Sequence, residues 1–182
     1  MSVRIAGAAA FAVRDASDAD VAAITDVYAH HVRTGLGSFE EVPPAVDEIA
    51  RRRAEVLARN LPYLVAVSAA GTVLGYAYAS VYRARSAYRF SVEDSIYVAP
   101  DSAGRGIGRA LLAALIARCS EAGFRQMVAV IGDSGNAGSI ALHERLGFRR
   151  VGLLPAIGYK HGRWVDSVLM QRELGEGAAT LP

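Results

Sequence analysis

The sequence contains a single cysteine, Cys119, which lies inside an apolar stretch with helical periodicity. A chain with one cysteine cannot form an internal disulfide framework, so the small disulfide-rich folds of secreted proteins are excluded. A buried thiol in such a stretch usually serves core packing. The fold must therefore be stabilised by a hydrophobic core rather than by covalent cross-links.

An excess of charge of either sign is also missing. Twenty basic and eighteen acidic residues give a formal net charge of +2 for 182 residues. This balance is too even to predict a nucleic-acid partner from bulk electrostatics, so small molecules are the expected ligands. The length fits one domain, which we place at residues 11–174, with flexible termini at 1–10 and 175–182.

Long hydrophobic runs are absent as well. The apolar run from Ile5 to Val13 is far shorter than the roughly 20 residues that cross a bilayer. It continues directly into Arg14 and then into a helix-start signal, Ser17 to Asp20, which favours a first strand over a cleaved leader peptide. We therefore expect no membrane partner and a cytoplasmic location.

Helical and strand periodicities alternate along the rest of the chain. Beyond the first strand, the pattern predicts helices at 18–32, 46–57, 108–122 and 136–146, and strands at 63–67, 73–82, 90–98, 126–131, 149–158 and 164–172. No repeat and no low-complexity linker divides this order. The sequence therefore predicts one α/β domain, with a mixed α+β sheet that carries helices on both faces.

A glycine-rich turn between a strand and a helix is the first candidate binding site. Gly104, Gly106 and Gly108 let successive amides point inward, and the helix amino terminus adds about half a positive charge. Arg105 and Arg109 add further positive charge, so a pyrophosphate is a well-matched ligand. A tight strand-to-helix turn would need the same glycines without any ligand, and this segment alone leaves both interpretations open.

Other phosphate-binding motifs fit this turn less well. A P-loop requires Lys and then Ser or Thr after its last glycine, whereas Gly108 is followed by Arg109 and Ala110. The spacing Gly-x-Gly-x-Gly also differs from the Gly-x-Gly-x-x-Gly of dinucleotide-binding folds. The segment Gly132 to Gly135 is similar to the nucleophile segment of serine proteases, but here it is predicted to be a turn that leads into a helix.

A second segment, Asn136 to Phe148, has the pattern Asn-x-x-Ser-x-x-Leu-x-Glu-x-Leu-Gly-Phe. Together with the glycine-rich turn, it resembles the GNAT acetyltransferase superfamily. The phosphinothricin and methionine sulfoximine acetyltransferase branch is similar at Tyr82 to Tyr88, Val92-Glu93, Leu142 to Glu144 and Gly158 to Trp164. The resemblance extends from Val13 to Leu174. It implies a mostly antiparallel, twisted central sheet, acetyl-coenzyme A as co-substrate and a homodimer.

The resemblance also assigns cofactor contacts to particular residues. Main-chain groups of Ile96, Tyr97 and Val98 would line the pantetheine arm, and Asn136 would hydrogen-bond it from the following helix. The turn residues Gly104, Arg105, Gly106, Ile107, Gly108 and Arg109 would hold the pyrophosphate. Many relatives have Gln or Arg where this chain has Ala103, so the turn relies more on its amides and on Arg105.

Amine acetylation needs a base for the ammonium proton and gains from an acid for the departing thiolate. The resemblance makes Glu93 the general base, directly or through water, and His143 the general acid, where many superfamily members have a tyrosine. Without the resemblance, Glu93 would be interpreted as a surface carboxylate and His143 as a structural histidine.

The acceptor-binding residues implied by the resemblance are Phe39, Arg83, Arg85 and Tyr88. A guanidinium can bind a carboxylate through paired hydrogen bonds, although both arginines could simply be solvated. Phe39 could equally serve the core or a dimer contact, and Tyr88 is similarly ambiguous. The adjacent His30 and His31 point in different directions on a helix and lack further ligands at metal spacing, so no metal is expected.

Two classes of function remain at this stage. The favoured one is an enzyme that acetylates a small amino-acid-like amine of the phosphinothricin, methionine sulfoximine or methionine sulfone type by direct transfer. The alternatives are a non-catalytic regulatory module that binds acyl-coenzyme A and an acetyltransferase for protein or peptide amines. The presence of both Glu93 and His143 argues against the module.

Overall fold

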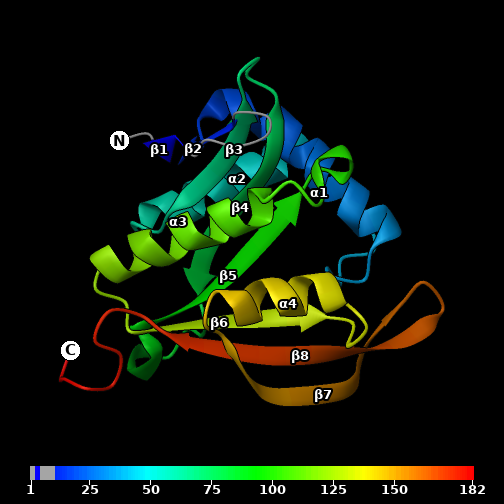
Figure 1. Cartoon of the computed structure of the whole chain (residues 1–182). Coiled ribbons are helices and arrows are strands. Elements are labelled where there is room, and N and C mark those ends of the chain that lie inside the picture. Colours follow the sequence, from blue (N-terminus) through cyan, green and yellow to red (C-terminus); the bar gives the residue numbers. More distant parts are fainter. Residues whose placement is uncertain (1–2, 5–10) are drawn as a thin grey trace.

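Eight strands form one sheet in the computed structural model, which describes residues 3–4 and 11–182 (Figure 1). They are β1 (Val3–Arg4), β2 (Phe11–Asp15), β3 (Tyr63–Ser68), β4 (Val73–Val81), β5 (Ser91–Val98), β6 (Gln126–Gly132), β7 (Arg149–Lys160) and β8 (Arg163–Glu173). Their spatial order is β1-β2-β3-β4-β5-β6-β8-β7, and all neighbours are antiparallel except β5 and β6. The predicted mostly antiparallel mixed sheet is confirmed.

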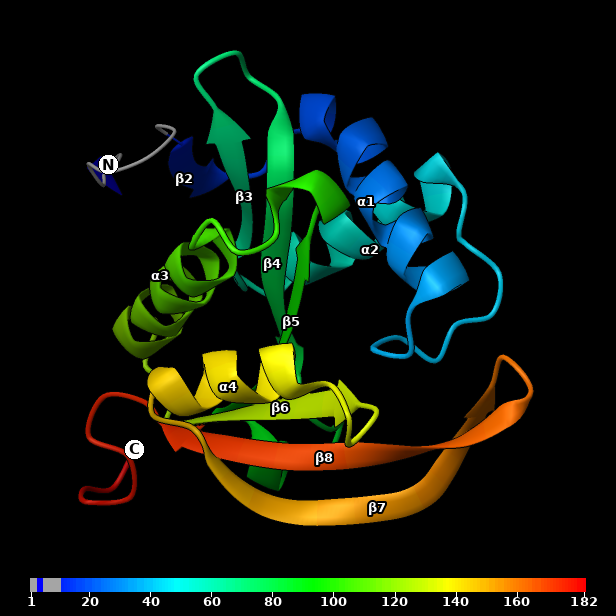
Figure 2. The same ribbon diagram turned by 45° about the vertical axis from the view of Figure 1, so that its right-hand side comes forward.

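Helices cover both faces of the sheet, as the sequence predicts. They are α1 (Val21–Thr34), α2 (Val46–Ala58), α3 (Ile107–Glu121) and α4 (Ala137–Arg145). Figure 2 shows α1 and α2 on one side of the β3–β5 strands and α3 on the other, while α4 lies along β6. Leu111, Leu112 and Leu115 bury α3 against the sheet with no exposed surface.

The predicted helix start at Asp18 is the start of a 3₁₀ turn, and the α-helix follows three residues later. Residues Asp18–Asp20 form a 3₁₀ turn, in which the Asp20 carboxylate accepts hydrogen bonds from the Ser17 amide at 2.7 Å and from Arg14 Nη2 at 2.8 Å. In a capping box, the carboxylate that accepts a hydrogen bond from the N-cap amide belongs to the third helical residue, so this pattern marks Ser17 as the N-cap. The first turn is 3₁₀, and the α-helix follows from Val21.

The expectations for the chain ends are only partly covered by the structure. Residues 1–2 and 5–10, including most of the apolar run, lie outside the described residues, while β2 supplies the expected strand at its end. At the other end, Arg125 donates hydrogen bonds to Thr180 Oγ1 at 3.0 Å and to the Leu181 carbonyl at 3.3 Å. No helix within the described residues has the length and apolar character needed to cross a membrane.

The parallel neighbours β5 and β6 separate partway along their length. They pair from Ser91 with Gln126 to Asp94 with Ala129, and beyond that point the pairing ends. On its other side β5 continues to pair with β4 as far as Val98. The facing main-chain edges beyond Asp94 therefore lack sheet partners, and unpaired peptide groups at such a position are available to a ligand.

Candidate active site

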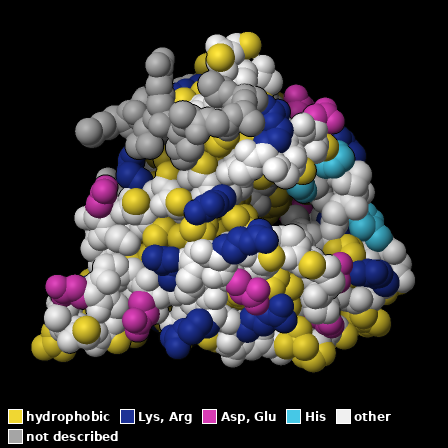
Figure 3. Space-filling model, in the orientation of Figure 1, with side chains coloured by type: hydrophobic (Ala, Val, Ile, Leu, Met, Phe, Trp, Pro, Cys, Tyr) yellow, Lys and Arg dark blue, Asp and Glu magenta, His cyan; other side chains and the backbone are white. Residues whose placement is uncertain are grey.

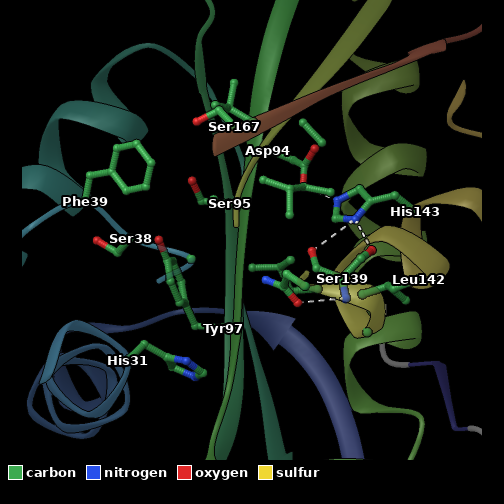
Figure 4. A pocket seen from close by; sticks show the side chains of 18 of the residues that line it. His31, Ser38, Phe39, Asp94, Ser95, Tyr97, Ser139, Leu142, His143 and Ser167 are labelled. Carbon is green, nitrogen blue, oxygen red and sulfur yellow. Dashed lines mark hydrogen bonds and ion pairs between the residues drawn. The ribbon is translucent and has the colours of Figure 1, made fainter. Parts of the chain in front are cut away.

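A cavity of about 620 Å³ occupies the opening between β5 and β6. Its walls come from α1 and the loop after it, from the edges of both strands and from α4. Figure 4 shows His31, Ser38 and Phe39 on one side of β5, with Ser139, Leu142 and His143 on the other. This volume lies in the range of ordinary small-molecule sites.

The residues expected to line the pantetheine arm are brought together here. Ile96, Tyr97 and Val98 all line the cavity. The Val98 carbonyl oxygen lies 2.8 Å from His31 Nε2, which shows that this oxygen points away from β4 and into the opening. Asn136 lines the same cavity and caps α4, because its Oδ1 accepts a hydrogen bond from the Ser139 amide at 3.2 Å.

The glycine-rich turn lies beyond the end of β5 and outside the lining of this cavity. Gly104 and Gly106 have φ values of +74° and +78°, which side chains other than glycine rarely adopt, and Gly106 caps α3. A Cβ on Gly108 would lie 3.3 Å from Leu142 Cδ2, so this glycine lets α3 start close to α4. The helix amino terminus and the cavity are therefore neighbours.

The other members of the turn contribute in two ways. Arg105 and Arg109 are exposed, whereas Ile107 is 1% exposed and packs its side chain into the core. Ile107 can therefore offer a ligand only its main chain. Figure 3 shows Lys and Arg side chains spread over the face where α3 and α4 lie, which suits an anionic ligand at this end of α3.

Glu93 is a half-buried carboxylate on β5 that lines the cavity. Burial raises the pKa of Glu93 above its usual value, and the neighbouring Asp94 charge raises it further. A carboxylate in this condition accepts a proton more readily than a solvated one, as a general base requires.

His143 is 2% exposed, and both of its ring nitrogens are engaged. Nδ1 lies 2.7 Å from the Ser139 carbonyl oxygen, and Nε2 lies 3.0 Å from Asp94 Oδ2. Burial alone would lower the pKa of His143, but the Asp94 hydrogen bond and charge and the Ser139 carbonyl outweigh burial and raise it. The ring packs edge-on against Phe148 at 4.9 Å.

Asp94 is a site residue that the sequence reasoning missed. It follows Glu93 directly and therefore faces the opposite side of the strand, where its side chain is 2% exposed. A carboxylate on the buried face of a strand is costly without a partner. A carboxylate at such a position in the sequence was therefore the signal that could have identified Asp94 as a site residue. The partner, His143, lies 49 residues further along the chain.

Phe39 lines the cavity and rests on the β7–β8 hairpin. A Cβ added to Gly158 would overlap the Phe39 ring, and one added to Gly132 would overlap the Leu36 carbonyl oxygen. Lys160 is 1% exposed and donates a hydrogen bond from Nζ to the Ser38 carbonyl at 2.7 Å. Two glycines and a buried lysine, none of them predicted, therefore fix the loop that carries Phe39.

Three of the predicted acceptor contacts lie elsewhere. Arg83, Arg85 and Tyr88 are exposed on the connection between β4 and β5 and do not line the cavity. The Arg83 guanidinium lies 5.2 Å from the centre of the Tyr82 ring and 5.9 Å from that of Tyr88. The structure therefore groups Arg83 with these aromatic rings and not with Glu93. Within residues 3–4 and 11–182, no cluster of three or more His, Cys, Asp or Glu could hold a metal ion.

A sheet split around a cavity, beside the glycine-rich start of α3, fits an N-acetyltransferase. The profile of the family described as Acetyltransferase (GNAT) matches residues 36–148. The chain belongs to this family.

Similar proteins support a particular branch of the family. The chain is 57% identical over 170 residues to phosphinothricin N-acetyltransferase from Alcaligenes faecalis, covering 93% of this chain and 86% of that protein. It is 44% identical over 165 residues to the L-methionine sulfoximine/L-methionine sulfone acetyltransferase of Pseudomonas aeruginosa PAO1, covering 89% and 94% of the two chains. The predicted phosphinothricin and methionine sulfoximine branch is thereby confirmed.

A solved structure shows the same fold. The phosphinothricin acetyltransferase from Sinorhizobium meliloti, determined in complex with acetyl-coenzyme A, superimposes with a TM-score of 0.91 at 52% sequence identity. The match covers 93% of this chain and 91% of that chain. The arrangement of strands and helices around the cavity is therefore shared with a protein that binds acetyl-coenzyme A.

Proposed function

We propose that this protein transfers the acetyl group of acetyl-coenzyme A directly to the amine of a free amino-acid-like acceptor of the phosphinothricin, methionine sulfoximine or methionine sulfone type. The observation that carries the proposal is the half-buried Glu93 carboxylate in a cavity between separated strands. The relatives from Alcaligenes faecalis and Pseudomonas aeruginosa support the acceptor class.

In this proposal the cofactor lies along the edge of β5 whose main-chain groups lack a strand partner beyond Asp94. The pantetheine arm, which carries amide groups, would replace the missing strand partner of Ile96, Tyr97 and Val98, with Asn136 on the other side. Its pyrophosphate would lie at the turn from Gly104 to Arg109, where the first amides of α3 have no partner within the helix. The thioester then lies at the end of the cavity where β5 and β6 part, near Glu93.

In this proposal catalysis depends on Glu93 and His143, which lie near the point where the two strands part. Glu93 removes a proton from the acceptor ammonium, directly or through water, and the free amine attacks the thioester carbonyl. His143 supplies a proton as the coenzyme A thiolate leaves. The raised pKa of His143 suits this role, because the ring keeps its proton at a pH where an ordinary histidine has lost it.

A thiol-release assay tests the acceptor class. Purified protein is given acetyl-coenzyme A with free L-phosphinothricin, L-methionine sulfoximine and L-methionine sulfone, and separately with peptides that offer amino-terminal or lysine amines. We expect kcat/KM to be highest for the free amino-acid analogues. Preference for peptides would support the protein acetyltransferase instead, and binding without thiol release from any amine would support the regulatory module.

We further propose that Arg83, Arg85 or both recognise the acceptor carboxylate, with Tyr88 beside them. Because the two guanidinium groups are exposed outside the cavity, contact with the acceptor requires the β4–β5 connection to approach Glu93 when substrate binds. Loss of a charged hydrogen bond costs about 1.5–3 kcal/mol, or about 10- to 100-fold in kcat/KM.

Alanine substitutions test this proposal through a pair of acceptors. Arg83→Ala and Arg85→Ala should reduce kcat/KM for a free amino acid by about 10-fold or more, and much less for its carboxamide. Arg59→Ala is the matched control, because Arg59 is an exposed arginine at the end of α2, outside the cavity lining. Equal losses on both acceptors would assign the two arginines to structure or to the cofactor.

A homodimer is proposed on the basis of an exposed apolar strip. Val151, Leu153, Leu154, Ile157, Tyr159 and Trp164 of β7 and β8 are between 41% and 67% exposed. Residues 151–159 contain no charge, so two copies can face each other about a twofold axis without repulsion. In sedimentation experiments, we expect wild type to be dimeric and Leu153→Glu monomeric, while Leu57→Glu, at an exposed site on α2, stays dimeric. A monomeric wild type would contradict the dimer.

A further inference from the structure

The pair formed by Asp94 and His143 lies where β5 and β6 part. Asp94 is opposite Ala129 at the last paired position of the two strands, and both side chains of the pair are 2% exposed. One carboxylate oxygen, Oδ2, contacts His143 Nε2 at 3.0 Å, while Oδ1 is buried without a hydrogen-bond partner among the described residues. The carboxylate is thus directed at a single partner.

The hydrogen bonds determine which protons the imidazole carries. The Ser139 carbonyl can only accept, so Nδ1, at 2.7 Å, must carry a proton. Asp94 Oδ2, at 3.0 Å, can accept a proton from Nε2, and the raised pKa of His143 favours the doubly protonated ring. Glu93 and Cys119 are the other titratable groups near Asp94, and burial raises the pKa of the Cys119 thiol to about 12, so it stays neutral.

Ser139 is the hydroxyl that connects this ring to the cavity. Its Oγ lies 3.5 Å from His143 Nδ1. Both residues line the cavity, but Ser139 is half-buried whereas His143 is 2% exposed, so the hydroxyl is the more accessible of the two groups. Asp94 and Ser139 both lie next to the His143 ring in Figure 4. The Ser139 amide is held by the Asn136 side chain, so the residue is fixed while its hydroxyl can rotate.

We propose that Asp94, His143 and Ser139 form a proton relay, in which Asp94 keeps the Nε2 proton in place and Ser139 passes the Nδ1 proton to the thiolate of coenzyme A. Ser139 is the catalytic residue that touches the leaving sulfur, and Asp94 is a positioning residue that acts through His143. The relay rests on the proposed function, since it concerns departure of coenzyme A from the acetyl group.

The step balances in protons and electrons. Once the new C–N bond has formed, the C–S bond breaks, and the electron pair of the C–S bond stays on sulfur. Sulfur takes the Ser139 hydroxyl proton, and Ser139 Oγ takes the proton from His143 Nδ1. The ring ends neutral, with its Nε2 proton still donated to Asp94, and is recharged from solvent. The amine proton has meanwhile left through Glu93.

A change of leaving group tests Ser139. With acetyl-coenzyme A, Ser139→Ala should lower kcat about 100-fold, the lower end of general acid catalysis. With the selenoester analogue, whose selenolate departs without a proton at neutral pH, the loss should be less than about threefold, because no acid is needed. Ser134→Ala, in the turn before α4 and outside the cavity lining, is the control. Equal losses with both donors would overturn the relay.

Histidine NMR tests Asp94 without any acceptor, so this result stands even if the proposed acceptor class is wrong. In wild type, we expect ¹⁵N shifts of His143 with both nitrogens protonated at neutral pH. In Asp94→Asn, the ring should titrate at lower pH, and the alkaline limb of the kcat profile should shift the same way with little change in KM for acetyl-coenzyme A. A neutral His143 in wild type, or an unchanged titration in the variant, would overturn the positioning role.

Discussion

Glu93→Gln should reduce kcat by about 100- to 10,000-fold, the usual contribution of a general base, while acetyl-coenzyme A binds normally. The substitution keeps the size of the side chain but removes the ability to accept the amine proton. Glu93 lines the cavity near the point where β5 and β6 part, whereas the proposed pantetheine contacts are main-chain groups further along β5. Glu93→Gln should therefore lose turnover but keep its affinity for acetyl-coenzyme A.

The pH profile provides a second measure of the same residue. Burial and the Asp94 charge raise the pKa of Glu93, so its carboxyl stays protonated to a higher pH than an ordinary glutamate. Since only the deprotonated form can act as base, activity should fall as pH decreases through this raised pKa. The acidic limb of kcat/KM should therefore lie above the usual glutamate range and should be lost in Glu93→Gln.

Glu144→Gln is the matched control, because Glu144 is an exposed glutamate on α4 that pairs with Arg150. It should retain wild-type turnover and the wild-type acidic limb. If Glu93→Gln retained full activity with an unchanged acidic limb, another group would have to be the base.

Gly106→Val should weaken acetyl-coenzyme A binding about 100-fold. Gly106 is the N-cap of α3 with a φ of +78°, and a β-branched residue there would move φ to negative values and displace the first amides of the helix. Loss of two amide hydrogen bonds to a phosphate, at about 1.5 kcal/mol each, removes about 3 kcal/mol, or about 100-fold in Kd. Calorimetric titration measures this directly.

The other end of the same helix offers a matched control. Gly123 follows α3 with a φ of +86°, and a Cβ at either Gly106 or Gly123 would meet no atom within 4 Å. Gly123→Val should therefore cost a similar free energy of unfolding, about 1–2 kcal/mol, and leave cofactor affinity unchanged. Equal affinity in both variants would show that the turn does not bind the pyrophosphate.

The features predicted correctly from sequence are those with local signals. Helix and strand periodicity located the main elements, and the order of strand, glycine-rich turn and helix located the end of β5 and the start of α3. These patterns depend on residues within one or two turns of each other.

The features that were missed depend on contacts between distant parts of the chain. Lys160 contacts the Ser38 carbonyl across 122 residues, and Asp94 meets His143 only because α4 packs over the point where β5 and β6 part. No local pattern encodes such pairs. Arg83 and Arg85 are near Glu93 in sequence, but they are exposed on the β4–β5 connection outside the cavity lining, so their acceptor role stays a prediction.

The site also supports the proposed direct transfer of the acetyl group. Cys119 is the sole cysteine, has no exposed surface, and has a pKa raised to about 12 by burial, so it is unsuited to carry an acetyl group. The cavity of about 620 Å³ is large enough for the end of the pantetheine arm and a small amino acid together. Both substrates are therefore expected to be bound when the acetyl group moves.

Two-substrate initial-rate kinetics test this account most directly. Acetyl-coenzyme A is varied at several fixed concentrations of the preferred amino-acid acceptor, and the protein mass is measured after incubation with acetyl-coenzyme A alone. The account predicts double-reciprocal lines that intersect and a protein mass that does not change. Parallel lines together with a protein heavier by one acetyl group would contradict it, because the acetyl group would then pass through a covalent intermediate on the enzyme.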